Sequence, residues 1–212
     1  MRYAPDTRME EAAAIEPTAF TAMLIEANGL DRREFKNWAF YPGMLFNSPD
    51  KWWGDYGRRD FPHEGIDFCL YEDHYGSVRH LGAGTDIPVM HSGVVKALFK
   101  DYLGLAIIIE HESKPGRQDK LLSVYAHTQP RRGIGPGVFV KTGESIATIA
   151  DTRRSKAKIL PHLHVSFGIP SPELVYEPFV WDSIRDPRQV ELLDPQTYIG
   201  GPCQVLEFQN IS

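Results

Sequence analysis

Histidine and aspartate recur in three short patterns of the sequence. They are His63-Glu64-Gly65-Ile66-Asp67, Tyr125-Ala126-His127 and His162-Leu163-His164. Side chains of a β-strand alternate between its two faces, so a strand would place the imidazoles of His162 and His164 on one face. Two imidazoles on one face are suited to binding a metal ion. The third pattern therefore indicates a metal site.

The run that contains Asp67 offers a carboxylate for the same site. Alternation along residues 66–70 would turn Ile66, Phe68 and Leu70 toward a core and Asp67 toward the opposite face. Two histidines and one carboxylate leave a zinc ion with an open coordination position. That set is typical of catalytic rather than structural zinc.

Other catalytic chemistries find little support in the sequence. His63-Glu64 resembles the start of a helical HExxH zinc motif, but Gly65 and Ile66 are poor helix formers and Pro62 precedes them. No G-x-S-x-G motif is present. Cys69 and Cys203 do not form a C-x-x-C pair, and we interpret Cys69 as a core residue. The remaining histidines are interpreted as structural: His74, His80, His91 and His111.

Short strands would have to position these residues. Apolar or β-branched runs bounded by turn residues predict strands at 93–99, 105–110, 121–127, 145–150 and 162–169. No helix-length segment separates the runs, which favours antiparallel pairing. We predict a mainly β fold, a small antiparallel β-sandwich or barrel-like domain.

The flanking regions have a different composition. In residues 7–30, Phe20, Met23, Leu24 and Ala27 are spaced as one helical face and Asn28-Gly29 supplies a stop, so we predict one or two short helices. Residues 31–62 show no period and are interpreted as an aromatic loop region that packs on the core or lines a groove. Residues 203–208 could add a strand.

Charge and hydropathy exclude several classes of function. With 28 acidic and 23 basic residues, a net charge of −5 argues against a nucleic-acid partner. The longest nearly apolar run, residues 102–109, is far shorter than the roughly 18–20 residues of a membrane span, so no transmembrane segment is predicted. No apolar signal-peptide core is visible, and the residues alone fix neither localisation nor oligomeric state.

Taken in order, the motifs resemble those of the lysostaphin/LytM-type zinc metallopeptidases, bacterial enzymes that cut peptidoglycan. The matches are His63 to Asp67, Gly84-Thr85, Pro88-Val89, Gly93-Val94-Val95, residues 107–111, Tyr125 to His127, Val140, Gly143, Ile146, residues 161–165, Asp194-Pro195 and Tyr198. The resemblance implies a peptidase domain over 59–200. Residues 1–58 would be an extension packed on it, and residues 201–212 a C-terminal tail.

The resemblance also implies the roles of the site residues. His63, Asp67 and His164 would bind Zn²⁺, and His127 and His162 would be catalytic histidines without a bond to the metal. One neutral imidazole can accept a proton from the attacking water and another can donate a hydrogen bond to the oxyanion. We assign the first role to His162 and the second to His127, although the two could be exchanged.

The implied activity is a zinc metalloendopeptidase that hydrolyses amide bonds in peptidoglycan stem peptides or cross-bridges. Family members act in the periplasm, in the cell envelope or outside the cell. Two alternatives stay open, namely a non-catalytic binding or regulatory module on the same fold and a peptidase for another peptide substrate.

The sequence departs from the family pattern around the site. Residues 151–158 replace a Gly- and Ser-rich turn, and Val165-Ser166 stand where Phe-Glu is usual, so the groups that orient the ligands would differ. Tyr56 is a candidate for the upstream tyrosine of the family. We expect residues 7–58 to pack firmly and shape the groove, rather than to place Asn47 or Asp50 on the metal as a releasable plug.

Overall fold

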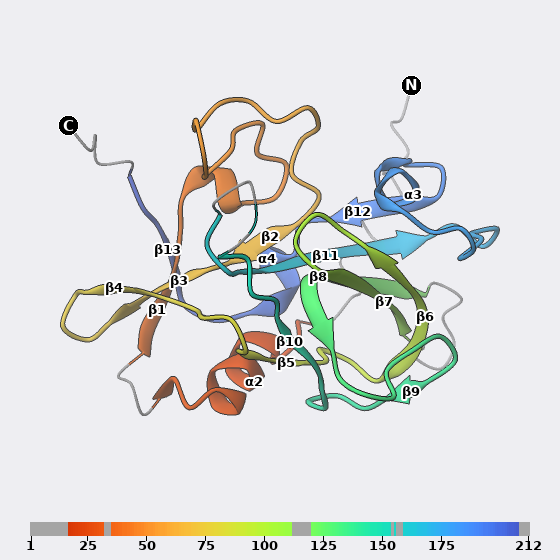
Figure 1. Cartoon of the computed structure of the whole chain (residues 1–212), viewed down its shortest axis with the longest axis horizontal. Helices are drawn as coiled ribbons and strands as arrows, with labels where there is room; N and C mark the ends of the chain where they lie inside the picture. Colours follow the sequence, from red (N-terminus) through yellow and green to blue (C-terminus); the bar gives the residue numbers. More distant parts are fainter. Residues whose placement is uncertain (1–16, 32–34, 112–119, 154, 156–158, 208–212) are drawn as a thin grey trace, which may run out of the picture.

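Antiparallel strands make up most of the regular structure, and they form two sheets (Figure 1). The computed structural model describes residues 17–31, 35–111, 120–153, 155 and 159–207. The five predicted strands are present as β6 (Gly93–Lys100), β7 (Leu105–His111), β8 (Leu121–Pro130), β10 (Ser145–Ile149) and β11 (Leu163–Pro170). The prediction of a mainly β, antiparallel fold is confirmed.

The larger sheet is built around these strands, in the order β12-β11-β8-β7-β6-β9. Its other members are β2 (Ile66–Phe68), β5 (Asp86–Pro88), β9 (Phe139–Val140) and β12 (Val190–Leu193). β2 pairs with β11, and β10 pairs with both β5 and β8. The pairing of β2 with β11 brings an early segment of the chain beside a late one.

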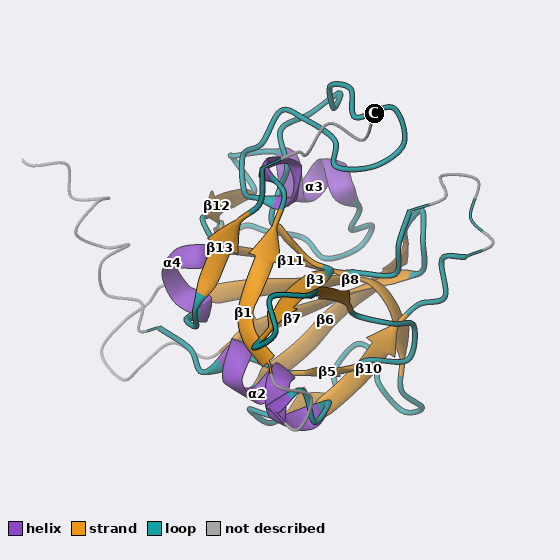
Figure 2. Cartoon of the chain, turned by 90° about the vertical axis from the view of Figure 1, so that its left-hand side faces the viewer, coloured by secondary structure: helices purple, strands orange, loops and turns teal. Residues whose placement is uncertain are grey.

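A smaller sheet joins both ends of the chain to its middle (Figure 2). Its order is β13 (Cys203–Val205), β1 (Phe35–Phe40), β3 (Leu70–Asp73) and β4 (Val78–His80). β1 lies in the region interpreted as a loop, which is a correction. Three consecutive residues at its end, from Trp38 to Phe40, are buried, so the strand lacks the alternation that would have predicted it.

The helices are few and short. The predicted N-terminal helix is present as α2 (Phe20–Ala27), which buries Phe20 and Leu24, whereas residues 7–16 of the predicted helical region lie outside the described residues. The other helices in the described residues are η2 (Pro42–Met44), α3 (Trp181–Arg185) and α4 (Gln196–Ile199). No described helix is long and apolar enough to cross a membrane.

The larger sheet is covered on both faces. Ile107 and Ile109 of β7 face the main core, which contains Phe20, Trp38 and Phe40 of the N-terminal region. Ala106 and Ile108 face a second cluster with Phe179 and Ile184. Because both faces are buried, β7 is a continuous apolar run rather than an alternating one.

Aromatic side chains of the N-terminal region surround Phe68 at the end of β2. Its ring centroid lies 5.0 Å from that of Trp38, 5.6 Å from Phe40 and 5.8 Å from Phe20. Such edge-to-face packing of large rings holds a strand firmly in place. Phe68 follows Asp67 directly, so this packing also fixes the strand that carries the predicted ligand.

Candidate metal centre and catalytic site

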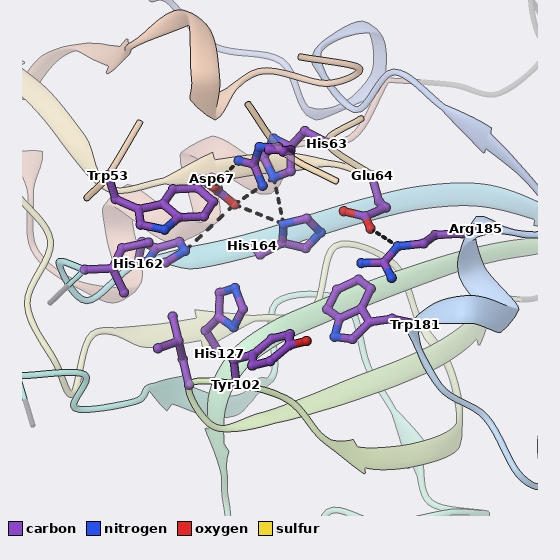
Figure 3. A pocket seen from close by; sticks show the side chains of 13 residues that line it. Trp53, His63, Glu64, Asp67, Tyr102, His127, His162, His164, Trp181 and Arg185 are labelled. Atoms are coloured by element: carbon purple, nitrogen blue, oxygen red, sulfur yellow. Dashed lines mark hydrogen bonds and ion pairs between the residues drawn. The ribbon is translucent and has the colours of Figure 1, made fainter. Parts of the chain in front are cut away.

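Three neighbouring strands bring all five predicted site residues to one place (Figure 3). Asp67 on β2 is paired with His164 on β11, and His164 is paired with Ala126 on β8, immediately before His127. His162 precedes His164 by two residues, so both rings point to the same side, as predicted. Gly65 permits the approach of β2, because a Cβ there would lie 2.1 Å from the carbonyl oxygen of Val165.

Three of these residues form a cluster of potential metal ligands. His63 Nε2 lies 3.1 Å from Asp67 Oδ1 and 3.0 Å from His164 Nδ1, and His164 Nδ1 lies 2.9 Å from Asp67 Oδ1. All three residues are buried. Ligands of tetrahedral zinc at ~2.0–2.1 Å are ~3.3 Å apart, close to this spacing. The donor set therefore fits a zinc ion.

The other ring nitrogen of each ligand histidine has its own partner. His63 Nδ1 lies 3.0 Å from the carbonyl oxygen of Leu45, so it must carry the proton and Nε2 is free to bind a metal. His164 Nε2 lies 2.7 Å from Ser166 Oγ, to which it can donate while Nδ1 binds the metal. Ser166 thus orients His164 from the position where the family usually has a glutamate.

Asp67 is held through its second carboxylate oxygen. Oδ2 accepts a hydrogen bond of 2.7 Å from the Trp52 indole, and the Arg59 guanidinium lies 3.6 Å away. Burial acts to raise the pKa of Asp67, but the charges and hydrogen bonds of the neighbouring histidines outweigh it and keep the pKa well below its ordinary value. The carboxylate is therefore ionised and available as a ligand.

His162 lies beside the cluster with a fixed ring. Its Nδ1 donates to the Leu160 carbonyl oxygen at 2.8 Å, which leaves a lone pair on Nε2, 4.0 Å from Asp67 Oδ1. The ring of Trp52 packs edge-on against it at 5.0 Å. Burial lowers the pKa of His162 to about 3, so the ring is neutral near pH 7 and can accept a proton.

His127 faces the cluster from β8, with its ring centroid 4.7 Å from that of His162. Its backbone has a φ of 62°, a left-handed conformation that is uncommon for a residue other than glycine. Asp101 Oδ2 accepts hydrogen bonds from His127 N at 2.8 Å and from His127 Nδ1 at 3.2 Å. No sequence motif identifies Asp101, which lies 26 residues before His127.

The five residues line a cavity of about 330 Å³. Its remaining lining comes from Trp53, Arg59, Glu64, Tyr102, Leu103, Ile159, Trp181 and Arg185. An ion pair between Glu64 and Arg185 closes one end, and Arg185 belongs to α3 (Figure 3). No motif pointed to Tyr102, Trp181 or Arg185, because they come from a loop and a short helix far away in the sequence.

Tyr56, the candidate upstream tyrosine, is not one of the described residues that line this cavity, and its side chain is exposed. Asp50 is paired with Arg58, while the backbone of Asn47 donates to the His63 carbonyl oxygen. Of the aromatic region, Trp38, Phe40 and Trp52 are packed in the core and Trp53 lines the cavity. The extension thus contributes both to the core and to the site.

Two of the residues interpreted as structural, Cys69 and His111, are buried and do not line the cavity. The Cys69 thiol is fully buried 3.7 Å from the Pro161 carbonyl oxygen, and burial raises its pKa to about 12. His111 is buried between Ser92 and Ser123. In the loop at 151–158, Arg153 is exposed and paired with Asp151, while residues 154 and 156–158 lie outside the described part.

Part of the sequence that forms the site matches the model of a known family. Residues 72–171 match the model of peptidase family M23. The matched region contains His127, His162 and His164 and begins after His63 and Asp67. Over this part of the chain the match supports the resemblance to lysostaphin/LytM-type peptidases that the motifs indicated.

Solved structures of M23 proteins are similar to this chain. One is the catalytic domain of a point mutant of the prophage-encoded M23 protein EnpA from Enterococcus faecalis, with 20% identity over 76% of this chain and 97% of that chain and a TM-score of 0.40. Another is lysostaphin, with 21% identity over 76% of this chain, 52% of that chain and a TM-score of 0.42. No curated protein matches the chain.

Proposed function

We propose that the protein is a zinc-dependent endopeptidase that hydrolyses amide bonds in peptidoglycan stem peptides or cross-bridges. The observation that carries the proposal is the convergence of His63 Nε2, Asp67 Oδ1 and His164 Nδ1, with the outer nitrogen of each histidine already engaged. These three residues would hold the zinc ion. When bound, zinc supplies Lewis-acid chemistry, which polarises a carbonyl group and makes a water molecule more acidic.

The two other histidines would have different roles, one as proton acceptor and one as hydrogen-bond donor. Nε2 of neutral His162 can accept a proton from the attacking water, because its Nδ1–H is committed to the Leu160 carbonyl oxygen. Protonated His127 can donate a hydrogen bond from Nε2 to the oxyanion that develops on the substrate carbonyl. The cavity keeps both rings beside the ligand cluster.

The shape of the site supports an extended substrate. A second hollow of about 380 Å³ shares Tyr102, Trp181 and Arg185 with the cavity, so the depression continues beyond the ligand cluster. Aromatic side chains form much of the wall of the cavity, and they can pack against a peptide backbone. A chain segment would therefore fit better than a small solute.

Metal analysis and digestion of purified peptidoglycan test the proposal together. The wild type should contain about one zinc per chain and should release new amino termini, whose fragments mass spectrometry identifies. His164→Ala should lose both zinc and activity. His80→Ala is the matched control, because His80 is an exposed residue of β4 that does not line the cavity.

The outcomes separate the alternatives. Cleavage of other peptides but not of peptidoglycan would assign a different substrate to the same chemistry. A protein that binds zinc but cleaves neither would be a non-catalytic module. Full zinc occupancy in His164→Ala would contradict the assignment of the ligands.

A further inference from the structure

We propose that Asp101 is a positioning residue that fixes the tautomer and direction of the His127 ring, so that Nε2 faces the substrate. The catalytic part of this inference rests on the proposed function, whereas the part that concerns the ring does not. Asp101 lies in the connection between β6 and β7, and the hydrogen bonds of its side chain reach across to β8.

The contacts of Asp101 determine which nitrogen of His127 carries the proton. An ionised carboxylate can only accept hydrogen bonds, so at 3.2 Å from Oδ2 the Nδ1 atom must be the donor. Burial acts to raise the pKa of Asp101, but hydrogen bonding to His127 and the charge of its ring outweigh this, and the pKa lies well below its ordinary value. The carboxylate is therefore ionised and Nδ1 of His127 carries a proton, so that Nε2 is the nitrogen left to face the substrate.

Asp101 is itself rigidly held. Its side chain has no exposed surface, and Oδ1 accepts hydrogen bonds from Leu103 N at 2.8 Å and from Gly104 N at 2.6 Å. Its Oδ2 also accepts the backbone N–H of His127, whose φ of 62° needs support from its surroundings. One carboxylate thus stabilises both the strained backbone and the ring of His127.

The second histidine has no carboxylate at its Nδ1 in the described structure, and the Asp67 carboxylate lies 4.0 Å from its Nε2. His162 donates its Nδ1–H to the neutral carbonyl oxygen of Leu160. A carboxylate stabilises a positively charged ring much more than a carbonyl does. The two histidines are therefore suited to different tasks, His127 to holding a proton and donating from Nε2, and His162 to accepting one.

Replacement of Asp101 by asparagine tests the inference with little change in volume. The amide NH₂ group can donate to His127 Nδ1, which favours a neutral ring with its proton on Nε2, and the variant lacks the negative charge that stabilises the doubly protonated ring as a donor. In the wild type we expect the nitrogen NMR spectrum of the zinc-free protein to show a protonated Nδ1 in His127. In Asp101→Asn we expect this signature to be lost and kcat to fall by roughly 10²–10⁴-fold with KM nearly unchanged.

Asp73→Asn is a closely matched control. Asp73 is also buried, its Oδ1 accepts hydrogen bonds from the backbone N–H groups of Tyr75 and Ser77, and its Oδ2 accepts one from Arg79. It belongs to β3, outside the cavity lining. We expect a loss of thermal stability similar to that of Asp101→Asn, but a wild-type kcat.

A double variant tests whether the effect of Asp101 on kcat depends on His127. If Asp101 acts through His127, then Asp101→Asn should change kcat little once His127 is alanine. An equal loss in both backgrounds, or a wild-type His127 with an unprotonated Nδ1, would overturn the inference. Should Asp101→Asn fail to fold, the wild-type spectrum still decides the matter. If the wild type cleaves nothing, the proposed function fails, whereas the tautomer result stands or falls independently.

Discussion

The site is assembled from two regions that hold their side chains in different ways. The region that matches the M23 model supplies His127, His162 and His164 from β8, β11 and the residues just before β11. Two of these rings are oriented by groups only two residues away, the Leu160 carbonyl and the Ser166 hydroxyl. This part of the site follows largely from local chain geometry and strand pairing.

The upstream region supplies His63 and Asp67, and their orientation depends on distant residues. The Leu45 carbonyl oxygen, 18 residues before His63, accepts the Nδ1–H of that ring. The Trp52 indole, 15 residues before Asp67, donates to its carboxylate. Two of the three proposed metal ligands thus depend on the packing of the N-terminal extension. We therefore expect damage to the extension to weaken metal binding, and substitution of His127 or His162 in the matched region to weaken catalysis without loss of metal.

Removal of the extension should have the largest effect. A chain that begins near Arg58 would lack α2, β1 and the buried side chains of Trp38, Phe40 and Trp52. Each such side chain contributes roughly 1.5–3 kcal/mol, while a domain is stable by only about 5–15 kcal/mol. We expect the truncated chain to be insoluble or unfolded, as circular dichroism and solubility would show.

The truncation also tests the division of the chain. We propose that residues 17–58 and the peptidase region fold as one unit, because β1 joins β3 and β13 in a single sheet. A soluble truncated chain with higher activity than the full chain would instead identify the extension as an inhibitory segment.

Substitutions in the matched region should separate catalysis from metal binding. His127→Ala and His162→Ala are each expected to keep zinc and to lose roughly 10²–10⁴-fold in kcat, because they would act on protons and not on the metal. Zinc content and peptidoglycan hydrolysis, measured on the same preparations, check both parts. Loss of zinc in either variant would make that residue a ligand.

Part of the site could be predicted from the sequence, because the alternation of side chains along a strand determines which residues of a short motif share a face. The His-x-His pattern fixed the relative direction of His162 and His164 once the segment was a strand, and that strand begins within one residue of the predicted start. The structure brings His63 and Asp67 to the same place, as the family resemblance implied. The alternation of side chains along a strand is a local property, so it can be recognised in the sequence.

The residues that orient the site were mostly not predictable. Trp52 lies in a stretch without a period, and its contact with Asp67 depends on the fold of the whole extension. Asp101 lies 26 residues before His127, and its hydrogen bonds to β8 leave no signal in the sequence. β1 was interpreted as a loop because its buried residues are consecutive. Side-chain contacts between distant segments leave no local pattern.

A smaller effect concerns His111, a histidine of the matched region that does not line the cavity. Burial lowers its pKa to about 4, below the usual value near 6.5. Between these values the unfolded chain binds the additional proton, so stability is complete above pH ~6.5 and is lost as the pH falls toward ~4.

His111→Gln removes this titration and can still form hydrogen bonds with Ser92 and Ser123. From pH 7 to pH 5 the wild type should lose about 2 kcal/mol of unfolding free energy more than the variant does. Urea denaturation at both pH values measures the difference. The same loss in both proteins would show that His111 does not contribute to acid sensitivity.

The smallest and most specific effect should come from Trp52→Phe. The substitution keeps an aromatic ring but removes the N–H that donates to Asp67 Oδ2 at 2.7 Å. Groups that orient a metal ligand typically change affinity by ~10–100-fold, and because Arg59 also lies near the same oxygen we expect about 10-fold weaker zinc binding.

Trp38→Phe is the matched control for this change. Trp38 is equally well buried, but among the described residues its indole nitrogen has no hydrogen-bond partner, so the substitution alters packing alone. Both variants should lower the melting temperature, whereas only Trp52→Phe should weaken zinc binding in a titration against a competing chelator. Equal affinities in the two variants would mean that the extension supports the fold without tuning the metal site. A selective loss would show that one indole hydrogen bond links the extension to the ligand half of the site.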